Sequence, residues 1–589
     1  MKKTILTICL MLCAISASAV KAYPEPITVT QPDGTQLTVI AHGDEDCHWF
    51  TTTDGVLLAH VGNHFFVAQI TPDGLLSATT QLAHEVLLRT AEEQQLVAAQ
   101  DSKAFYMQAQ QAARKRIPIG TTSPAYFPHT GTPKAMVILV EFADMSFSVA
   151  DPYKSFNDYL NSLDPLPNYG LREDRNHGSV RKYFTDMSQG LFSPQFDLYG
   201  PVKASKNWAY YGENVGGSDN SSRLQELMRE ACIAIDDTVD FSAYDSNGDG
   251  YVDLVYFIYA GYSESMGASS DCIWPKSGTS GIGTYDGLKV SRYGVNNELN
   301  YYPDYPLSAE PYKRMNGIGL FCHEFSHTLG LPDVYPTNSE AQLTDNQTME
   351  YWDVMDGGEY TDNSYCPTPY TPWEKEVMGW TEITELTDTA QLTLDTETFY
   401  RIQGEDNEYL ILQNVQNTGW ASKLLGHGLL VYRIDYTNAS AKPRTTVNLG
   451  DYPNNVKGKP GMTLVPADGL IISSYRVYKN ESEKSETKPY TNTEYFNSHY
   501  GDPYPGTSNV TSIEEVALNR SVLKKPIYNI CEEEGIITLD YLKEFTSAVS
   551  LSTMDAVAKP AATYDLQGRQ VAFPTKGIYI RGNKKFVVK

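Results

Sequence analysis

The feature that most constrains the fold is a pair of histidines four residues apart, His323 and His327, in the segment HEFSH. In a helix, positions i and i+4 lie one turn apart on the same face, so both imidazoles can reach one ion. Glu324 stands beside the first histidine, where it can accept a proton from a water molecule. The preceding segment GIGLFC is apolar. The sequence therefore predicts a helix, buried beneath a cleft, that carries a metal site.

Two further residues extend this pattern. Gly330 follows His327 by three positions, and Asp333 follows it by six. A glycine there can end the helix with a positive φ and turn the chain back toward the metal, which makes Asp333 the candidate third ligand. Two histidines and one carboxylate leave one position on zinc open for water, which is the catalytic arrangement. The alternative is that Asp333 only caps the helix, and the third ligand is then one of three glutamates: Glu359, Glu374 or Glu376.

A methionine follows in the segment YWDVMDGGEY, where Met355 lies 22 residues after Asp333. A tight turn that carries a methionine beneath a zinc site supports the histidine ligands without competing for the ion. This placement is typical of the Met-turn of metzincin-type proteases. Tyr360 and Tyr365 come after the turn and are candidates for a hydrogen bond to a developing oxyanion.

The segments HEFSHTLGLPDVY, WDVMDGGEY and PWEKEVMGW resemble those of the immune inhibitor A-like secreted metalloproteases. The segments SVRKYFTDMSQGLF, LLGHGLLVYRID and GDPYPG agree, and the resemblance covers about residues 134–542. It implies an α+β, metzincin-like catalytic domain with a β-rich C-terminal part, and zinc-dependent endopeptidase activity. His323, His327 and Asp333 occupy the family's ligand positions and Glu324 its catalytic position. In that role Glu324 is the general base for a water molecule whose pKa zinc lowers to about 7.

An acidic loop, DSNGDGYVD, predicts a second metal site. It places oxygen ligands at the first, third, fifth, seventh and ninth positions of a calcium loop, with a glycine at the sixth. Position twelve is Tyr256 rather than glutamate, so we expect a truncated loop that braces the fold. The alternative is an acidic turn that binds no ion. The candidate calcium ligands are Asp245, Asn247, Asp249, the Tyr251 carbonyl and Asp253.

The N-terminal residues predict export. Residues 1–22 combine Lys2 and Lys3, a short apolar run and the small-residue pattern Ala17-Ser18-Ala19, which is typical of a signal peptide cleaved after Ala19 or Ala22. Residues 23–133 are expected to form a propeptide domain of β hairpins, a helix over 91–115, and a linker with a basic processing site at residues 114–116.

Latency is expected to come from the same domain. The segment HGDEDCHW resembles a pattern in propeptides of secreted bacterial proteases. Cys47 and His48 are therefore candidates for keeping the protease latent as a zymogen. The alternative is that they belong to an ordinary polar hairpin.

The expected order of the remaining parts is a catalytic domain over 134–380, a β-rich part over 381–542, a linker over 543–560 and a tail over 561–589. The tail pieces YDLQGR, KGIYI and GNKK resemble a C-terminal sorting domain of the type IX secretion system. That resemblance implies the outer-membrane secretion machinery as a partner. The alternative is a small pair of hairpins without a targeting role.

Composition narrows the classes of function. The chain has 72 acidic and 46 basic residues and a net charge of −26, which argues against nucleic-acid binding. After the signal peptide no segment is long and apolar enough to predict a transmembrane anchor. We expect a secreted or cell-surface protease that acts on proteins or peptides. The alternatives are a catalytically inactive, protease-like binding protein at the cell surface and another metallohydrolase such as a glycan deacetylase. The completeness of the site favours the protease.

Overall fold

The computed structural model describes residues 16–44, 48–71, 75–102, 105, 126–166, 176–215, 219–300, 314–337, 341, 348–405, 408–435, 453–474, 491–543, 563–565, 577–581 and 584–588. The chain divides into two compact units, Met1–Lys543 and Glu544–Lys589. Both helices and sheets are present, which confirms the predicted α+β class. None of the helices within the described residues is long and apolar enough to cross a membrane.

A mixed six-stranded sheet forms the framework of the site, in the order β1-β11-β12-β10-β8-β9. Its centre is parallel, because β10 pairs in parallel with both β8 and β12 and β8 pairs in parallel with β9. β11 runs antiparallel to β12. The strands are β1 (Ser16–Ala19), β8 (Lys134–Glu141), β9 (Gln195–Lys203), β10 (Val255–Tyr259), β11 (Lys276–Tyr285) and β12 (Leu288–Asn297).

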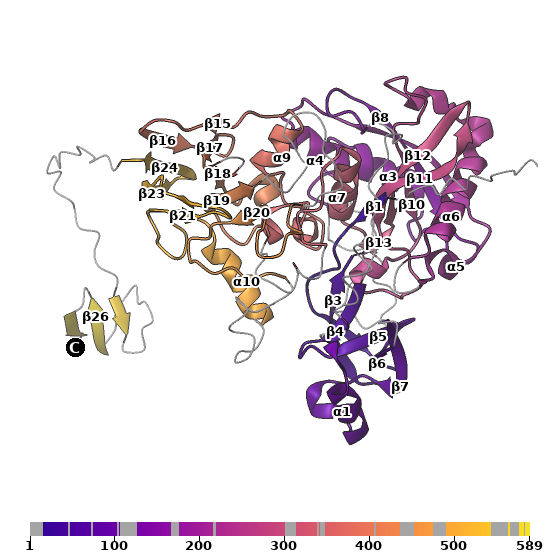
Figure 1. Cartoon of the computed structure of the whole chain (residues 1–589), viewed down its shortest axis with the longest axis horizontal. Coiled ribbons are helices and arrows are strands. Elements are labelled where there is room, and N and C mark those ends of the chain that lie inside the picture. Colours follow the sequence, from indigo (N-terminus) through magenta and orange to yellow (C-terminus); the bar gives the residue numbers. More distant parts are fainter. Residues whose placement is uncertain are drawn as a thin grey trace, which may run out of the picture. The chain divides into compact units, whose positions relative to one another are not determined.

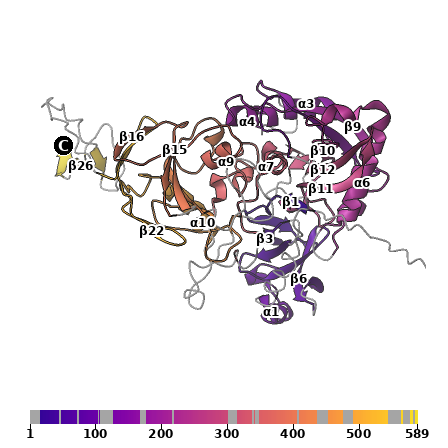
Figure 2. The same ribbon diagram turned by 45° about the horizontal axis from the view of Figure 1, so that its top comes forward.

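Helices cover both faces of this sheet (Figures 1 and 2). Strand residues alternate between two apolar cores: Val137 and Leu139 of β8 face one, and Met136 and Ile138 face the other. The first core contains α3 (Pro152–Asn161), α4 (Val180–Met187) and α7 (Ile318–Thr328). The second contains α6 (Ser221–Ile235), whose apolar face is buried. Shorter elements are α5 (Trp208–Gly212), β13 (Leu299–Asn300) and β14 (Arg314–Met315).

The N-terminal strands form a separate antiparallel meander. The predicted hairpins are present, and in two of their Asp-Gly turns Gly34 and Gly55 take positive φ values of 86° and 85°. Of the helix predicted over 91–115, the structure has α1 (Ala91–Ala98), and most of the rest lies outside the described residues. The strands are β2 (Ile27–Thr30), β3 (Gln36–Gly43), β4 (His48–Thr52), β5 (Leu57–Val61), β6 (His64–Ile70) and β7 (Leu76–Leu82).

Strands dominate residues 384–541. Two sheets, β15-β17-β18-β19-β20 and β16-β24-β23, share an apolar core, and α9 (Pro372–Val377) and α10 (Asn492–Gly501) flank this region. The strands are β15 (Thr384–Glu385), β16 (Ala390–Leu394), β17 (Phe399–Gln403), β18 (Glu408–Val415), β19 (Gly428–Asp435), β20 (Met462–Leu464), β21 (Val516–Ala517), β22 (Val522–Leu523), β23 (Ile527–Glu533) and β24 (Ile536–Tyr541).

The second unit contains one small antiparallel sheet. Its strands are β25 (Thr563–Asp565), β26 (Gly577–Arg581) and β27 (Lys584–Val588). The segment KGIYI contributes to β26. Only the first two residues of YDLQGR and the last two of GNKK belong to the described residues.

Strand β1 is the unexpected element. Sequence analysis assigns its residues to the end of a signal peptide, whereas here they pair antiparallel with β11, from Ser16 opposite Thr279 to Ala19 opposite Lys276. Both views show β1 beside β11 and close to α7 (Figures 1 and 2). The chain then continues into residues 20–23, which are buried.

Candidate active site

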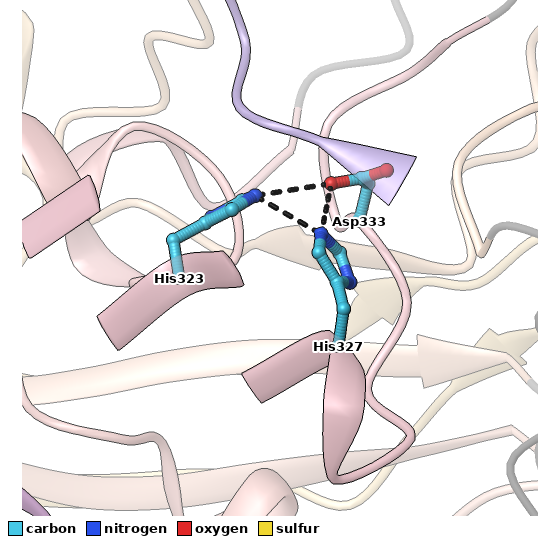
Figure 3. A group of neighbouring side chains, drawn as sticks. All are labelled: His323, His327 and Asp333. Atoms are coloured by element: carbon cyan, nitrogen blue, oxygen red, sulfur yellow. Dashed lines mark hydrogen bonds and ion pairs between the residues drawn. The ribbon is translucent and has the colours of Figure 1, made fainter. Parts of the chain in front are cut away.

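Helix α7 carries the two histidines and is buried along its whole length. A Cβ atom at Gly319 would lie 1.9 Å from the carbonyl oxygen of Glu359, so only glycine allows the helix to pack this closely against the 3-10 turn at Gly358–Tyr360. One helical turn separates His323 from His327, and their rings point toward a common point (Figure 3).

The chain turns back after the helix and brings Asp333 to the histidines. Gly330 has a φ of 103°, and its N–H donates to the carbonyl of His327 over 2.9 Å. This left-handed conformation reverses the chain within a few residues. Asp333 is buried, and it forms with the two histidines the one group of potential metal-binding side chains found within the described part of the chain.

The three donor atoms form a nearly regular triangle (Figure 3). The Nε2 atoms of His323 and His327 lie 3.2 Å apart, and Asp333 Oδ1 lies 3.3 Å from the first and 3.1 Å from the second. With metal–ligand distances of about 2.0–2.1 Å, the edges of a coordination tetrahedron are about 3.3 Å long. The triangle therefore has the size of one face of a zinc site.

The remaining ring nitrogens fix the tautomers. His323 Nδ1 lies 2.8 Å from the carbonyl of Val354, and His327 Nδ1 lies 2.7 Å from the carbonyl of Leu331. A carbonyl only accepts, so each Nδ1 carries the proton and each Nε2 presents a lone pair. Asp333 Oδ1 consequently faces two lone pairs and receives no hydrogen bond. Three buried electron-pair donors aimed at one point fit a bound cation.

The turn after Asp333 supports this group. The carbonyl that orients His323 belongs to Val354, and the next residue, Met355, is completely buried. The carbonyl of Met355 accepts from the N–H of Val334, and its N–H donates to Asp353 Oδ1 over 2.7 Å. The turn is thus tied both to the first histidine and to the loop that carries Asp333.

The other glutamates that could serve as the third ligand lie elsewhere. Glu374 belongs to a capping box with Thr371 at the start of α9, and Glu376 forms an ion pair with Arg401. Glu359 is buried in the 3-10 turn beneath α7 and is not part of the metal-binding group.

Glu324 is completely buried beside the group. Burial raises the pKa of Glu324 to about 8, against the opposing effect of the charge on His327. Its Oε1 accepts a hydrogen bond from the backbone N–H of Val20 over 2.7 Å. With its raised pKa, the carboxyl of Glu324 can exchange a proton with a chemical group that takes the place of the Val20 nitrogen.

The N-terminal segment continues from strand β1 and lies against Glu324. The indole N–H of Trp274 donates to the Val20 carbonyl over 2.9 Å, and the Tyr360 hydroxyl donates to the Lys21 carbonyl over 2.6 Å. Together with the β1–β11 pairing, these contacts bind backbone atoms and are independent of the side chains. The sequence analysis missed Trp274 and Lys21, because nothing in the sequence relates residues so far apart.

The two tyrosines proposed to stabilise an oxyanion, Tyr360 and Tyr365, have different hydrogen-bond partners in the structure. Tyr360 contacts the backbone of the N-terminal segment, as described above. The Tyr365 hydroxyl instead donates over 2.9 Å to the carbonyl of Met315, in strand β14, which precedes α7.

The residues proposed for latency lie outside the metal-binding group, as far as they are described. His48 contacts Glu264 over 3.1 Å and packs against the ring of Trp274, with 4.5 Å between centroids. Cys47 lies outside the described residues.

The acidic loop is held mainly by its own backbone N–H groups. Asp245 accepts from the N–H groups of Gly248, Asp249 and Gly250, and Asp253 accepts from that of Ser246. Asn247 accepts from the N–H of Asp249, and Asp249 accepts from the N–H of Tyr251. Burial raises the pKa of Asp253, as do the charges of Asp245 and Asp249.

Comparison with known proteins identifies the region that contains the site. Residues 125–381 match the family model described as Immune inhibitor A peptidase M6, catalytic domain. This stretch is similar to an M6-type peptidase domain, and it includes His323, Glu324, His327, Asp333 and Met355.

Two curated relatives are similar to part of the chain. The Pre-pro-metalloprotease PrtV of Vibrio cholerae serotype O1 (strain M66-2) is 26% identical over 279 residues, which is 42% of this chain and 30% of the relative. The Immune inhibitor A of Bacillus thuringiensis subsp. alesti is 26% identical over 300 residues, which is 43% of this chain and 41% of the relative. The matched part spans less than half the length of each relative.

Proposed function

We propose that this chain is a secreted zinc-dependent endopeptidase in which Glu324 is the general base. The observation that carries the proposal is the triangle formed by His323, His327 and Asp333, with edges of 3.1–3.3 Å, next to the buried carboxyl of Glu324. The M6-type domain and the names of its relatives support peptidase chemistry. The three donors fit zinc, which when bound would act as a Lewis acid on water and on the scissile carbonyl.

The residues of the chain supply the remaining steps. A peptide substrate takes the place of β1 along the edge of β11, because loss of β1 leaves the backbone groups of that edge available for pairing. Trp274 and Tyr360 hold the backbone beyond the scissile bond. Glu324 accepts a proton from the attacking water and delivers it to the leaving nitrogen. The nitrogen of Val20, 2.7 Å from Glu324, marks the place of that leaving nitrogen.

The N-terminal region is proposed to keep the enzyme latent. Residues 16–23 occupy the path that a substrate would take, so the protein as described here is closed to substrates. Signal-peptide cleavage after Ala19 would remove β1 but leave residues 20–23 in place, and proteolysis near residues 114–116 with removal of the preceding region would then open the site. A role of Cys47 or His48 in latency, calcium in the acidic loop, and secretion through the C-terminal tail remain parts of the same proposal.

Replacing Glu324 tests the function. Glu324→Gln removes the base but leaves the three metal ligands, so we expect about one zinc per chain and a loss of casein cleavage of at least about 100-fold. Wild-type protein must contain zinc and cleave casein. If Glu324→Gln cleaves casein at the wild-type rate, the role of Glu324 is wrong. If zinc-loaded wild-type protein cleaves no peptide, the alternative of an inactive, protease-like binding protein is favoured.

A further inference from the structure

The side chain of Lys21 fills a closed acidic pocket next to the metal-binding group. Its Nζ lies 3.1 Å from Asp356 Oδ1, 3.5 Å from Glu350 Oε2 and 5.7 Å from the ring centroid of Tyr335. The Lys21 side chain is 3% exposed, and the two carboxylates are 0% and 1% exposed. We call Glu350, Asp356 and Tyr335 the Lys21 pocket.

The pocket is built in advance for a cation. Glu350 is held by the hydroxyl of Tyr495 over 3.0 Å and by the N–H of Ser474 over 3.1 Å. Asp356 Oδ2 accepts from the N–H of Glu350 over 2.7 Å. Asp356 Oδ1 then points at Lys21. These contacts come from outside the N-terminal segment and do not depend on its presence.

Buried carboxylates without a cation are costly, because the charges lose their hydration and repel one another. Glu359, next to the same turn, is also completely buried, and neither of its carboxylate oxygens has a hydrogen-bond partner within the described part of the chain. Burial raises the pKa of Glu359, and the positive charge of Lys21 lowers it. Glu359 therefore also interacts electrostatically with Lys21. Departure of Lys21 would leave the pocket in need of another positive charge.

The backbone contacts of the N-terminal segment indicate which residue of a bound substrate would place its side chain in the Lys21 pocket. The N–H of Val20 faces Glu324, and β1 precedes it along β11. If the Val20 nitrogen marks the leaving group, Ala19 stands on the acyl side of the scissile bond and Lys21 is the second residue after it. The Tyr360 hydroxyl binds the carbonyl of Lys21 and thereby fixes this register.

We propose that the peptidase selects substrates with lysine or arginine at the second position after the scissile bond, and that the Lys21 pocket binds that side chain. This inference rests on the proposed function and adds the class of substrate. Glu350 and Asp356 are the specificity-determining residues, and Lys21 occupies their site until the N-terminal region is removed.

The test uses processed enzyme recovered from the culture medium and a set of quenched fluorescent peptides that differ only at this position. The four residues compared are lysine, arginine, norleucine and glutamate. We expect kcat/KM for the lysine and arginine peptides to exceed that for norleucine by at least about tenfold, and the glutamate peptide to be the poorest, since truncating one partner of a buried charge pair costs at least that much.

Variants then assign the effect to the pocket. Asp356→Asn and, separately, Glu350→Gln should lower the lysine-to-norleucine ratio of kcat/KM at least about tenfold. Asp362→Asn, whose carboxylate pairs with Lys423 at the surface, is the matched control and should keep the wild-type ratio. The ratio is internal to each preparation, so partial misfolding of a variant does not change it.

Three results would overturn the inference. Equal kcat/KM for lysine and norleucine peptides with wild-type enzyme rejects the basic preference while the proposed function stands. A basic preference that appears only at another position rejects the register. A lysine preference that survives in both pocket variants rejects the assignment to Glu350 and Asp356. Cleavage of the norleucine peptide reports the proposed function by itself, so failure of that function is recognised separately.

Discussion

The backbone nitrogen of Val20 donates a hydrogen bond of 2.7 Å to the carboxylate of Glu324, across 304 positions of sequence. This contact places the N-terminal segment where a substrate would be cut and occupies the residue proposed as the base. The proposed metal ligands, the proposed base and the proposed substrate path therefore all lie within one unit of the structure.

Replacing Asp333 should abolish metal binding. Asp333→Asn leaves two histidine donors and a weak amide ligand, so we expect the zinc content to fall below about 0.2 per chain after dialysis, since catalytic zinc needs three protein ligands. Elemental analysis measures this directly. Glu376→Gln is the control, because Glu376 pairs with Arg401 away from the group. Full zinc occupancy in Asp333→Asn would identify another third ligand.

A methyl group at Gly319 should destabilise the protein. Its Cβ would lie 1.9 Å from the carbonyl oxygen of Glu359, so α7 would have to move away from the turn beneath it. We expect Gly319→Ala to lower the free energy of unfolding by at least about 2 kcal/mol, the scale of overpacking in a close-packed core. The control is Gly281→Ala, where the nearest atom is a side-chain nitrogen at 3.7 Å. Equal melting temperatures for the two variants would contradict the close approach.

The two tyrosines are distinguished by kinetics. Because the Tyr360 hydroxyl binds a backbone carbonyl beyond the scissile bond, Tyr360→Phe should raise KM about three- to tenfold with little change in kcat, the effect of losing one hydrogen bond in uniform binding. Tyr365→Phe, which loses only a bond to Met315, should leave KM unchanged. A fall in kcat of about 100-fold in Tyr360→Phe, without a change in KM, would instead support an oxyanion role.

The N-terminal domain should become less stable in acid. Burial lowers the pKa of His60 to about 3, with a further decrease from the charges of His48 and His64. The unfolded chain binds a proton here below about pH 6.5 and the folded chain does not, so the free energy of unfolding rises with pH between about 3 and 6.5, by up to about 1.4 kcal/mol per pH unit.

His60→Phe should reduce that slope while it keeps the stacking on Phe65, whose ring centroid lies 4.3 Å away. Denaturant unfolding at pH 5, 6 and 7, in protein that also carries Glu324→Gln to prevent self-cleavage, measures the effect. The pKa of His48 is raised, because the charge of Glu264 and its hydrogen bond outweigh the effect of burial. The stability that His48 contributes is therefore lost as pH rises. This contribution is the same in the proteins with and without His60→Phe. An unchanged slope in His60→Phe would exclude His60 as the source.

Measurements of thermal stability test whether the acidic loop binds calcium. A cation would relieve the repulsion that the charges of Asp245 and Asp249 exert on Asp253. At about 100 times its dissociation constant, a ligand that binds only the folded state adds about 2.7 kcal/mol, which raises the melting temperature by several degrees. Chelator-treated protein with its zinc restored is titrated with calcium. If the melting temperature is the same with and without millimolar calcium, the loop is an ordinary acidic turn.

Local patterns predicted the local parts of this structure. The N-terminal hairpins and the buried helix α7 depend on periodicity and backbone preference over a few residues, and both are present. The spacing of His323, His327 and Asp333 predicted their grouping in the same way, because a helix followed by a glycine turn has little freedom.

The long-range relationships could not be predicted. Lys21 meets Asp356 across 335 positions, and Trp274 meets Val20 across 254. One hint was available: Glu350, Asp356 and Glu359 stand around a turn that was expected to be buried, and such carboxyls need a counter-charge. The sequence did not indicate that the counter-charge belongs to a segment read as the end of a signal peptide.

The pairing of β1 with β11 also bears on solubility. An uncovered strand at the side of a sheet is a template on which another copy of the same protein can add, and such growth leads to aggregates. While β1 stays in place, this template is capped. The leader strand therefore protects the chain from self-association until the leader is removed.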